Sequence, residues 1–259
     1  MEHVSKVTLA SENNISTITL NRPDSYNALD VETLQGLHEK IVEVEQNDDR
    51  VLLLTGAGKA FCAGGDINMM TENTSQDDFE KMMDVIADIT MRLYMLPKIV
   101  ITAVNGSAAG LGLSIALASD YIVANEDAEF GMLFAGIGLI PDGGGHFFLQ
   151  ERLGTHQAKQ FIWSLEKLKA KQAKKIGLVD VVTEAKAEEA VQEVVQKVMM
   201  APFQALIRSK MLLHETKQVE LAAFLEAEKA GQIDMSQTND HQEGITAFLE
   251  KRFPVFTGN

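Results

Sequence analysis

The chain has 259 residues, of which 46% are hydrophobic and 23% are charged, so it can form one sizeable core or a main domain with an appendage. Its formal net charge of −14 opposes binding to phosphate backbones, and we expect no nucleic-acid partner. A single cysteine excludes an internal disulfide framework. The sequence shows neither a signal peptide nor an apolar run long enough to span a membrane. We therefore expect a cytoplasmic protein with no membrane partner.

The hydrophobic pattern predicts strands and helices in alternation from the N-terminal end. Two alternating segments, residues 7–9 and 15–20, are separated by polar residues and predict a hairpin. A helix is expected over 31–46, where apolar residues recur on one face. Further along, the pattern predicts buried strands at 51–55, 99–104 and 121–123, and helices over 75–95 and 110–118. This alternation indicates an α/β fold with covered sheets.

The character of the chain changes after the last expected strand. The remainder is almost entirely helical in pattern and rich in Glu and Lys, with a break at Pro202. We place a boundary near residue 198, which gives a core of residues 1–198 and a helical region of residues 199–259. This helical region carries apolar stripes that are unfavourable in water, so we expect it to pack against other subunits.

Three glycine-rich stretches are candidates for chemistry. They are residues 60–67, 105–112 and 136–145, and the first two directly follow buried strands. Glycine at a strand end lets backbone N–H groups approach a ligand, and two such groups aimed at one point form an oxyanion hole. Ordinary turns explain the same spacing.

Several common motifs are absent from the sequence. Gly56-Ala57-Gly58-Lys59 lacks the first glycine of a phosphate loop, and no Ser or Thr follows the lysine. There is no Gly-x-Ser-x-Gly motif of a serine hydrolase, and the six histidines show no metal-ligand spacing, so we expect no metal site. Cys62, at the end of an expected strand, is interpreted as a small buried residue rather than a nucleophile.

The glycine-rich stretches and their neighbours resemble the crotonase superfamily of enoyl-CoA hydratases and isomerases. The N-terminal resemblance is carried by Asn21-Arg22-Pro23, Asn27-Ala28-Leu29 and residues 60–67. Further motifs at 105–112, 130–145 and 243–252 continue it in order over nearly the whole chain. The segments 138–145 and 254–258 are especially similar to the ring-opening acyl-CoA isomerases of phenylacetate breakdown.

The resemblance implies a spiral of repeated ββα units, with a C-terminal helical region that builds homotrimers or hexamers made of two trimers. It implies an acyl-CoA thioester as the substrate, with no cofactor beyond the coenzyme A that the substrate carries. The thioester oxygen would accept hydrogen bonds from the backbone N–H groups of Gly65 and Leu111, although the second position is usually glycine in the family. The residues that would contact CoA are Arg22, Ala28, Ala63, Asp66, Ile67 and Lys251.

The resemblance also places catalytic positions. Ser114 and Phe134 occupy the positions of the two glutamates of a hydratase, and neither can act as a carboxylate base. Asp142 matches the catalytic aspartate of some isomerases, and a single carboxylate beside an enolate suits a proton shift between two carbons. Burial against Phe134 and Leu133 is expected to raise the pKa of Asp142. The acyl group would lie among Ser114, Leu133, Phe134 and His146.

Two local alternatives stay open. Asp142 is also a suitable N-cap for a following helix. His146, four residues later, would face Asp142 if the segment is helical, or is a solvated or buried histidine without a catalytic role.

Three hypotheses about function follow. The leading one is an isomerase that shifts a double bond or opens a ring in an enoyl-CoA-type thioester. The second is an enoyl-CoA hydratase of fatty-acid or aromatic-acid degradation, in which Asp142 or a bound water replaces the missing glutamates. The third is a non-catalytic, RNA- or protein-binding protein of the same fold, against which the net charge weighs.

Overall fold

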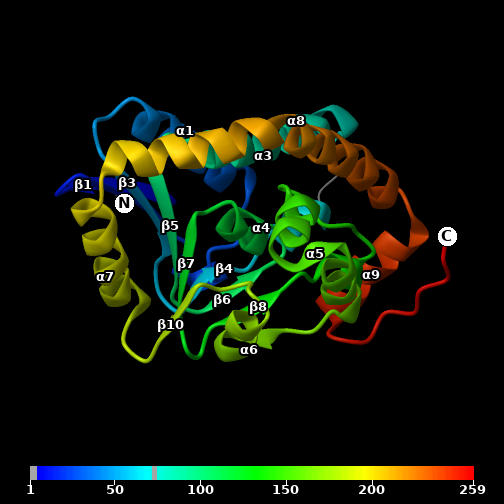
Figure 1. Cartoon of the computed structure of the whole chain (residues 1–259). Coiled ribbons are helices and arrows are strands. Elements are labelled where there is room, and N and C mark those ends of the chain that lie inside the picture. Colours follow the sequence, from blue (N-terminus) through cyan, green and yellow to red (C-terminus); the bar gives the residue numbers. More distant parts are fainter. Residues whose placement is uncertain (1–4, 72–74) are drawn as a thin grey trace.

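The computed structural model describes residues 5–71 and 75–259, and its strands form two sheets (Figure 1). The larger sheet has the strand order β1-β2-β3-β5-β7-β10, and the smaller one has the order β4-β6-β8-β9. Neighbouring strands are parallel except β1 with β2 and β8 with β9. The strands are β1 (Val7–Glu12), β2 (Ile15–Leu20), β3 (Val51–Gly56), β4 (Ala60–Cys62), β5 (Ile99–Val104), β6 (Ser107–Ala109), β7 (Tyr121–Asn125), β8 (Glu129–Gly131), β9 (Leu168–Lys169) and β10 (Val181–Thr183).

The central strands are formed by continuous apolar runs. Every residue of β3 and β5 is buried, which suits parallel strands that are covered on both faces. Their register pairs Val51 with Ile99. The predicted hairpin joins β1 to β2 through Asn13 and Asn14, whose φ values of 55° and 64° are left-handed and suit asparagine.

Three pairs of consecutive strands repeat one arrangement. β3, β5 and β7 lie in the larger sheet, and the short strand that follows each of them enters the smaller sheet. A helix follows each pair: α2 (Ile67–Thr71) and α3 (Gln76–Met95), then α4 (Leu111–Leu117), then α5 (Gly145–Ser164). This confirms the predicted ββα repeat. It also places the three glycine-rich stretches where the smaller sheet leads into helices.

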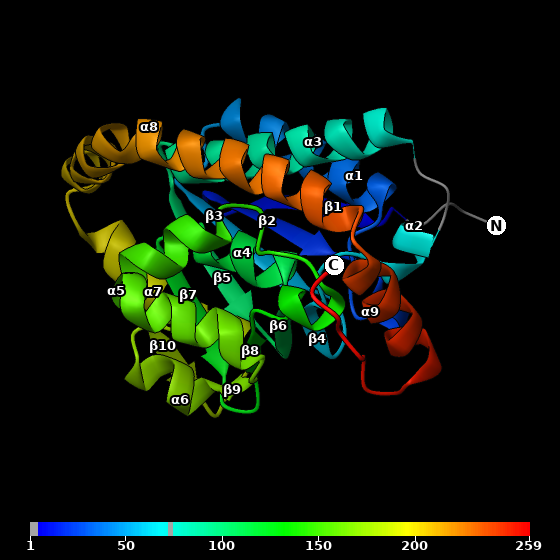
Figure 2. The same cartoon turned by 90° about the vertical axis from the view of Figure 1, so that its right-hand side faces the viewer.

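Helices cover the larger sheet on one side of the molecule. α1 (Val31–Glu45) packs against α3, and the long α8 (Phe203–Ser236) runs along α3 (Figures 1 and 2). Asp30 and Ser75 cap the N-termini of α1 and α3 by accepting hydrogen bonds from Thr33 N and Asp78 N. The remaining elements are α6 (Ala170–Lys175), α7 (Ala187–Met200), α9 (Asn239–Glu250) and the 3-10 helices η1 (Pro23–Ser25) and η2 (Phe134–Ile137).

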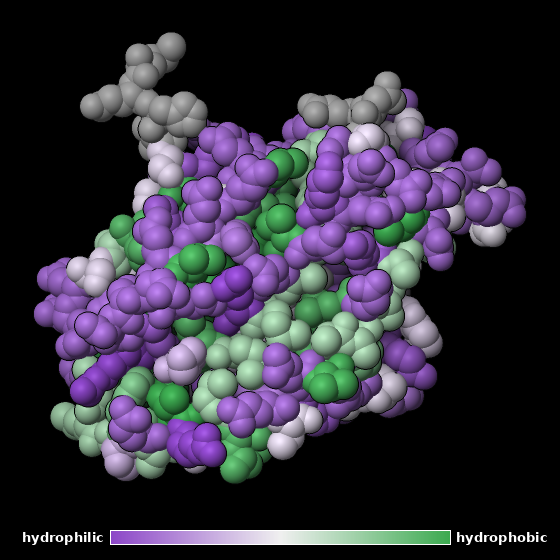
Figure 3. Space-filling view, turned by 90° about the horizontal axis from the view of Figure 1, so that it is seen from above, coloured by the Kyte–Doolittle hydropathy of each residue, from purple (hydrophilic) through white to green (hydrophobic). Residues whose placement is uncertain are grey.

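The C-terminal region is helical, as expected, and its long helix α8 begins directly after Pro202. α8 shares the main core of its own chain, because Leu221 and Leu225 are buried in the cluster that contains the sheet residues. Leu212 and Leu213 of the same helix are 56% and 63% exposed. Seen from above, apolar side chains are exposed between largely hydrophilic ones (Figure 3). The boundary near residue 198 stays a prediction.

Candidate active site

Asp142 lies in the loop between η2 and α5, and its side chain is almost completely enclosed. The residue is 6% exposed. Gln232 Nε2, from α8, donates a 2.8 Å hydrogen bond to Asp142 Oδ2, whereas Oδ1 is buried without a partner among the described residues. Burial, together with the negative charge of Glu228, raises the pKa of Asp142 to about 8 against the opposing effect of the Gln232 hydrogen bond. A carboxyl group poised in this way can take up and release a proton near neutral pH.

Glu228, also from α8, caps the helix that follows this loop. Its carboxylate is buried and accepts hydrogen bonds from Gly144 N at 2.7 Å and from His146 N at 3.0 Å. Gly144 is the N-cap residue of α5 and His146 lies in its first turn, where the helix dipole favours a negative charge. The N-cap position itself is Gly144, which has no side chain to cap with. The interpretation of Asp142 as the helix cap is therefore wrong, and the cap comes from α8.

His146 does not face Asp142. Its Nδ1 lies 2.8 Å from Glu228 Oε1, and because the carboxylate accepts, the ring donates this hydrogen bond. The expected spacing of four residues fails because α5 begins at Gly145 and leaves Asp142 outside the helix. His146 is thus a half-buried residue that orients Glu228.

Glu228 and Gln232 were not predicted from the sequence. Both lie on the face of α8 that Leu221 and Leu225 bury, at helical spacing. The sequence feature that could have identified them is a carboxylate and an amide on an otherwise apolar stripe of a helix. Polar groups are seldom buried unless they are hydrogen-bonded.

The residues expected around the acyl group surround the Asp142 loop from another side. Ser114 is fully buried, and its Oγ has no partner among the described residues. It borders the loop, since its Cβ would lie 3.3 Å from a Cβ placed on Gly143. Phe134 is 9% exposed and lies next to Gly110, and Leu133, before it, is half-buried. Ser114 and Phe134 are therefore enclosed beside the Asp142 loop, and Leu133 is partly accessible.

Two backbone N–H groups without partners come from neighbouring segments of this site. Within the described parts of the chain, neither Gly65 N nor Leu111 N donates a hydrogen bond. The segments lie against each other at Gly64, where an added Cβ would sit 2.8 Å from Ala109 O and 3.5 Å from Leu111 N. Gly64 has φ +98°, so both its conformation and this contact require glycine. The arrangement fits two donors aimed at one oxygen.

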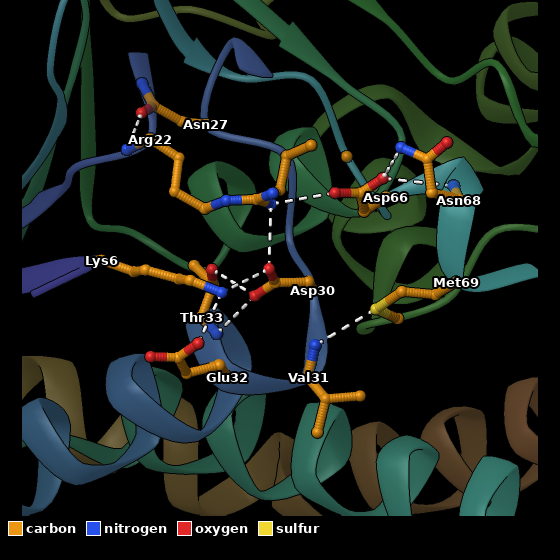
Figure 4. A network of polar contacts seen from close by, with 12 residues as sticks. Lys6, Arg22, Asn27, Asp30, Val31, Glu32, Thr33, Asp66, Asn68 and Met69 are labelled. Carbon is orange, nitrogen blue, oxygen red and sulfur yellow. Dashed lines mark hydrogen bonds and ion pairs between the residues drawn. The ribbon is translucent and has the colours of Figure 1, made fainter. Parts of the chain in front are cut away.

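Arg22, Ala28 and Asp66, expected at the CoA site, are brought together by Arg22, whose side chain points toward Asp66 in Figure 4. Arg22 Nη1 donates to Ala28 O at 2.6 Å and to Asp66 Oδ2 at 3.0 Å. It also lies 3.4 Å from Asp30, which Lys6 binds at 2.8 Å. Carboxylates therefore balance these two cations, and the network orders the loop more than it adds positive charge for a CoA phosphate.

The other expected CoA residues are at the edge of this region. Ala63 is exposed, and its N–H donates to Tyr26 O at 3.0 Å. Ile67 begins α2, which contacts α9. Lys251 ends α9 in a left-handed conformation, and its exposed side chain binds none of the described residues.

Cys62 is buried, as expected, and its chemistry is suppressed. It is fully enclosed, its Sγ donates to Asn27 O at 3.2 Å, and burial raises the pKa of the thiol to about 12. Across the described ranges, no cluster of three His, Cys, Asp or Glu side chains could hold a metal ion. None of the helices described is long and apolar enough to cross a membrane.

The sequence and the fold of this chain are similar to those of known proteins of one family. A sequence model described as enoyl-CoA hydratase/isomerase matches residues 10–259. YhaR of Bacillus subtilis, named only for the enoyl-CoA hydratase/isomerase family, is 42% identical over 93% of this chain and 95% of its own. The 1,2-epoxyphenylacetyl-CoA isomerase of Escherichia coli is 36% identical over 95% and 96%. The structure of an enoyl-CoA hydratase from Mycobacterium avium subsp. paratuberculosis superposes with a TM-score of 0.89, at 31% identity over 98% and 99%.

Proposed function

Because the chain belongs to the enoyl-CoA hydratase/isomerase family, we propose that it is an isomerase that shifts a double bond or opens a ring in an enoyl-CoA-type thioester through an enolate. The observation that carries this proposal is Asp142, a buried carboxyl group with a pKa of about 8 in a loop that contacts Leu111. The backbone N–H groups of Leu111 and Gly65 have no partner among the described residues. Ser114 and Phe134 stand where the family's hydratases have glutamates. Among the relatives, the Escherichia coli isomerase supports the same choice.

The proposed reaction moves one proton. Ionised Asp142 removes it from one carbon, the C–H electron pair enters the thioester, and the enolate oxygen accepts hydrogen bonds from Gly65 N and Leu111 N. Protonated Asp142 then returns the proton to a second carbon, which restores the carboxylate. The electron count does not change, so the step requires neither a metal nor a redox cofactor.

The test is Asp142→Asn, which keeps the shape of the side chain and removes the base. Double-bond migration in a 3-enoyl-CoA should fall about 10²- to 10⁴-fold, the usual contribution of general acid–base catalysis. Acyl-CoA affinity should change little, because the backbone N–H groups hold the thioester. Full isomerase activity in this variant, at wild-type stability, would refute the proposal.

Hydration is the second candidate, and one observation favours it. Ser114 Oγ and Asp142 Oδ1 are both buried without partners on either side of the Gly143–Gly145 turn, which suits a bound water. If this water is the nucleophile, Ser114→Ala should abolish hydration of crotonyl-CoA. If the protein is an isomerase, the same change should leave double-bond migration nearly intact.

We also propose that the chain forms homotrimers, alone or paired into hexamers. Leu212 and Leu213 of α8 are exposed, as are Phe248 and Leu249 of α9 at 58% and 52%. Apolar side chains in this number support burial against other subunits. A monomer in light scattering at micromolar concentration would contradict this.

A further inference from the structure

Gln232 is fixed in its orientation by a second partner. Its Nε2 donates to Ile140 O at 2.9 Å and to Asp142 Oδ2 at 2.8 Å, so both amide hydrogens are used. A backbone carbonyl only accepts, and turning the amide round would set Gln232 Oε1 against Ile140 O. The N–H that reaches Asp142 is therefore set by the backbone two residues earlier.

This anchoring makes the two oxygens of Asp142 unequal. Oδ2 shares its lone pairs with Gln232, whereas Oδ1 is buried with none of its lone pairs used by the described residues. A carboxylate oxygen without a donor is the better proton acceptor of the two. We propose that Gln232 is a positioning residue that makes Asp142 Oδ1 the oxygen that accepts and returns the substrate proton. This inference rests on the proposed isomerase function.

Among the described residues around Asp142, Glu228 is the charged group that opposes its ionisation. Glu228 lies one turn before Gln232 on α8 and is the charged group that acts on Asp142, and His146 of α5 binds Glu228. α4 contributes the uncharged Ser114, and α3 contributes Thr90, whose hydroxyl donates to Gly143 O at 3.1 Å. Gln232 favours the ionised carboxylate and Glu228 disfavours it. The same helix thus sets the basicity of Asp142 in both directions.

The test is Gln232→Met, which keeps the length of the side chain and removes both donors. The value of kcat for double-bond migration should fall about 10- to 100-fold, as expected for losing a hydrogen bond to a charged group. KM should change little, since Gln232 does not hold the thioester. The acid limb of the kcat/KM pH profile should move up by about one unit, because the ionised form loses its donor.

Two further variants separate positioning from structure. Gln218→Met changes an exposed glutamine of the same helix and should match the wild type in every readout. Gln232→Glu keeps the shape of the side chain and adds a carboxyl group beside Asp142. The acid limb of its kcat/KM pH profile should therefore move to higher pH, and by more than in Gln232→Met. This variant tests the inference even if Gln232→Met fails to fold. An unmoved acid limb in a folded Gln232 variant would overturn the inference, because a purely structural role predicts lower stability without a pH shift.

Measuring Asp142→Asn alongside separates this inference from the proposed function. If Asp142→Asn is inactive while Gln232→Met keeps the wild-type kcat and pH profile, only the role of Gln232 is refuted. If Asp142→Asn stays active, the isomerase mechanism itself is refuted.

Discussion

The side chain of Leu111 lies directly against the backbone of Gly143. A Cβ atom placed on Gly143 would come within 2.6 Å of Leu111 Cδ1. Leu111 carries one of the N–H groups proposed to bind the thioester oxygen, and Gly143 follows the proposed base. In the proposed mechanism, this contact holds the backbone that carries the Leu111 N–H against the loop that carries Asp142, so that both groups can act on one substrate.

Gly143→Ala should disturb this contact. The residue has φ +61°, which costs an L-amino acid about 1–2 kcal/mol, and the new methyl group would overlap Leu111. We expect lower stability and a large loss of kcat/KM. Gly177→Ala is the matched control, since Gly177 has φ +88° and its nearest contact is 3.8 Å away, at Arg152 O. We expect Gly177→Ala to be less stable than the wild type in denaturant unfolding and to keep its activity. Equal activity in both variants would show that the contact is not required.

The stability of the fold should depend on pH through Asp142. Its pKa rises from 3.8 to about 8 on folding, so between these values the folded chain holds a proton that the unfolded chain has released. The stabilisation present below about pH 4 is therefore lost as the pH rises towards 8, by up to about 1.4 kcal/mol per unit. Asp142→Asn does not titrate. The difference between its free energy of unfolding and that of the wild type should therefore increase in favour of the variant from pH 5 to pH 8, because only the wild type loses stability, and a constant difference would contradict the raised pKa.

The fold was largely predictable from the sequence because its signals are local. The apolar runs of β3 and β5 and the amphipathic pattern of α3 gave boundaries within one or two residues of those observed. The site was predictable only in part. Asp142, Gly65 and Leu111 lie in motifs, whereas Glu228 and Gln232 reach the site from a helix more than 80 positions later. No local sequence pattern indicates where such a helix packs, and for this reason Glu228 was not predicted as the partner of His146.

Lys210 should anchor the first half of α8. Its Nζ donates to Asp120 Oδ2 at 2.7 Å and to Lys98 O at 2.8 Å, with side chains only 6% and 15% exposed for Lys210 and Asp120. Lys210→Met leaves the carboxylate without its cation and should cost about 3–5 kcal/mol in denaturant unfolding. Lys217→Met on the same helix breaks an exposed pair with Glu151 and should cost less than about 1 kcal/mol. Similar costs for both would mean that the buried pair does not anchor α8.

Gly65→Pro tests the backbone donors. The change removes the N–H of Gly65 without adding charge, and it breaks no hydrogen bond, because this N–H has no partner among the described residues. Losing one oxyanion-hole donor typically lowers kcat about 10²- to 10³-fold, which is about 2.7–4 kcal/mol of barrier. The loss should apply to every acyl substrate, since the thioester is common to all of them. Gly65→Ala keeps the N–H and adds only a methyl group, so it should retain most of the activity. If Gly65→Pro folds and turns over as Gly65→Ala does, the enolate oxygen is bound elsewhere, and Leu111 N does not act together with Gly65 N.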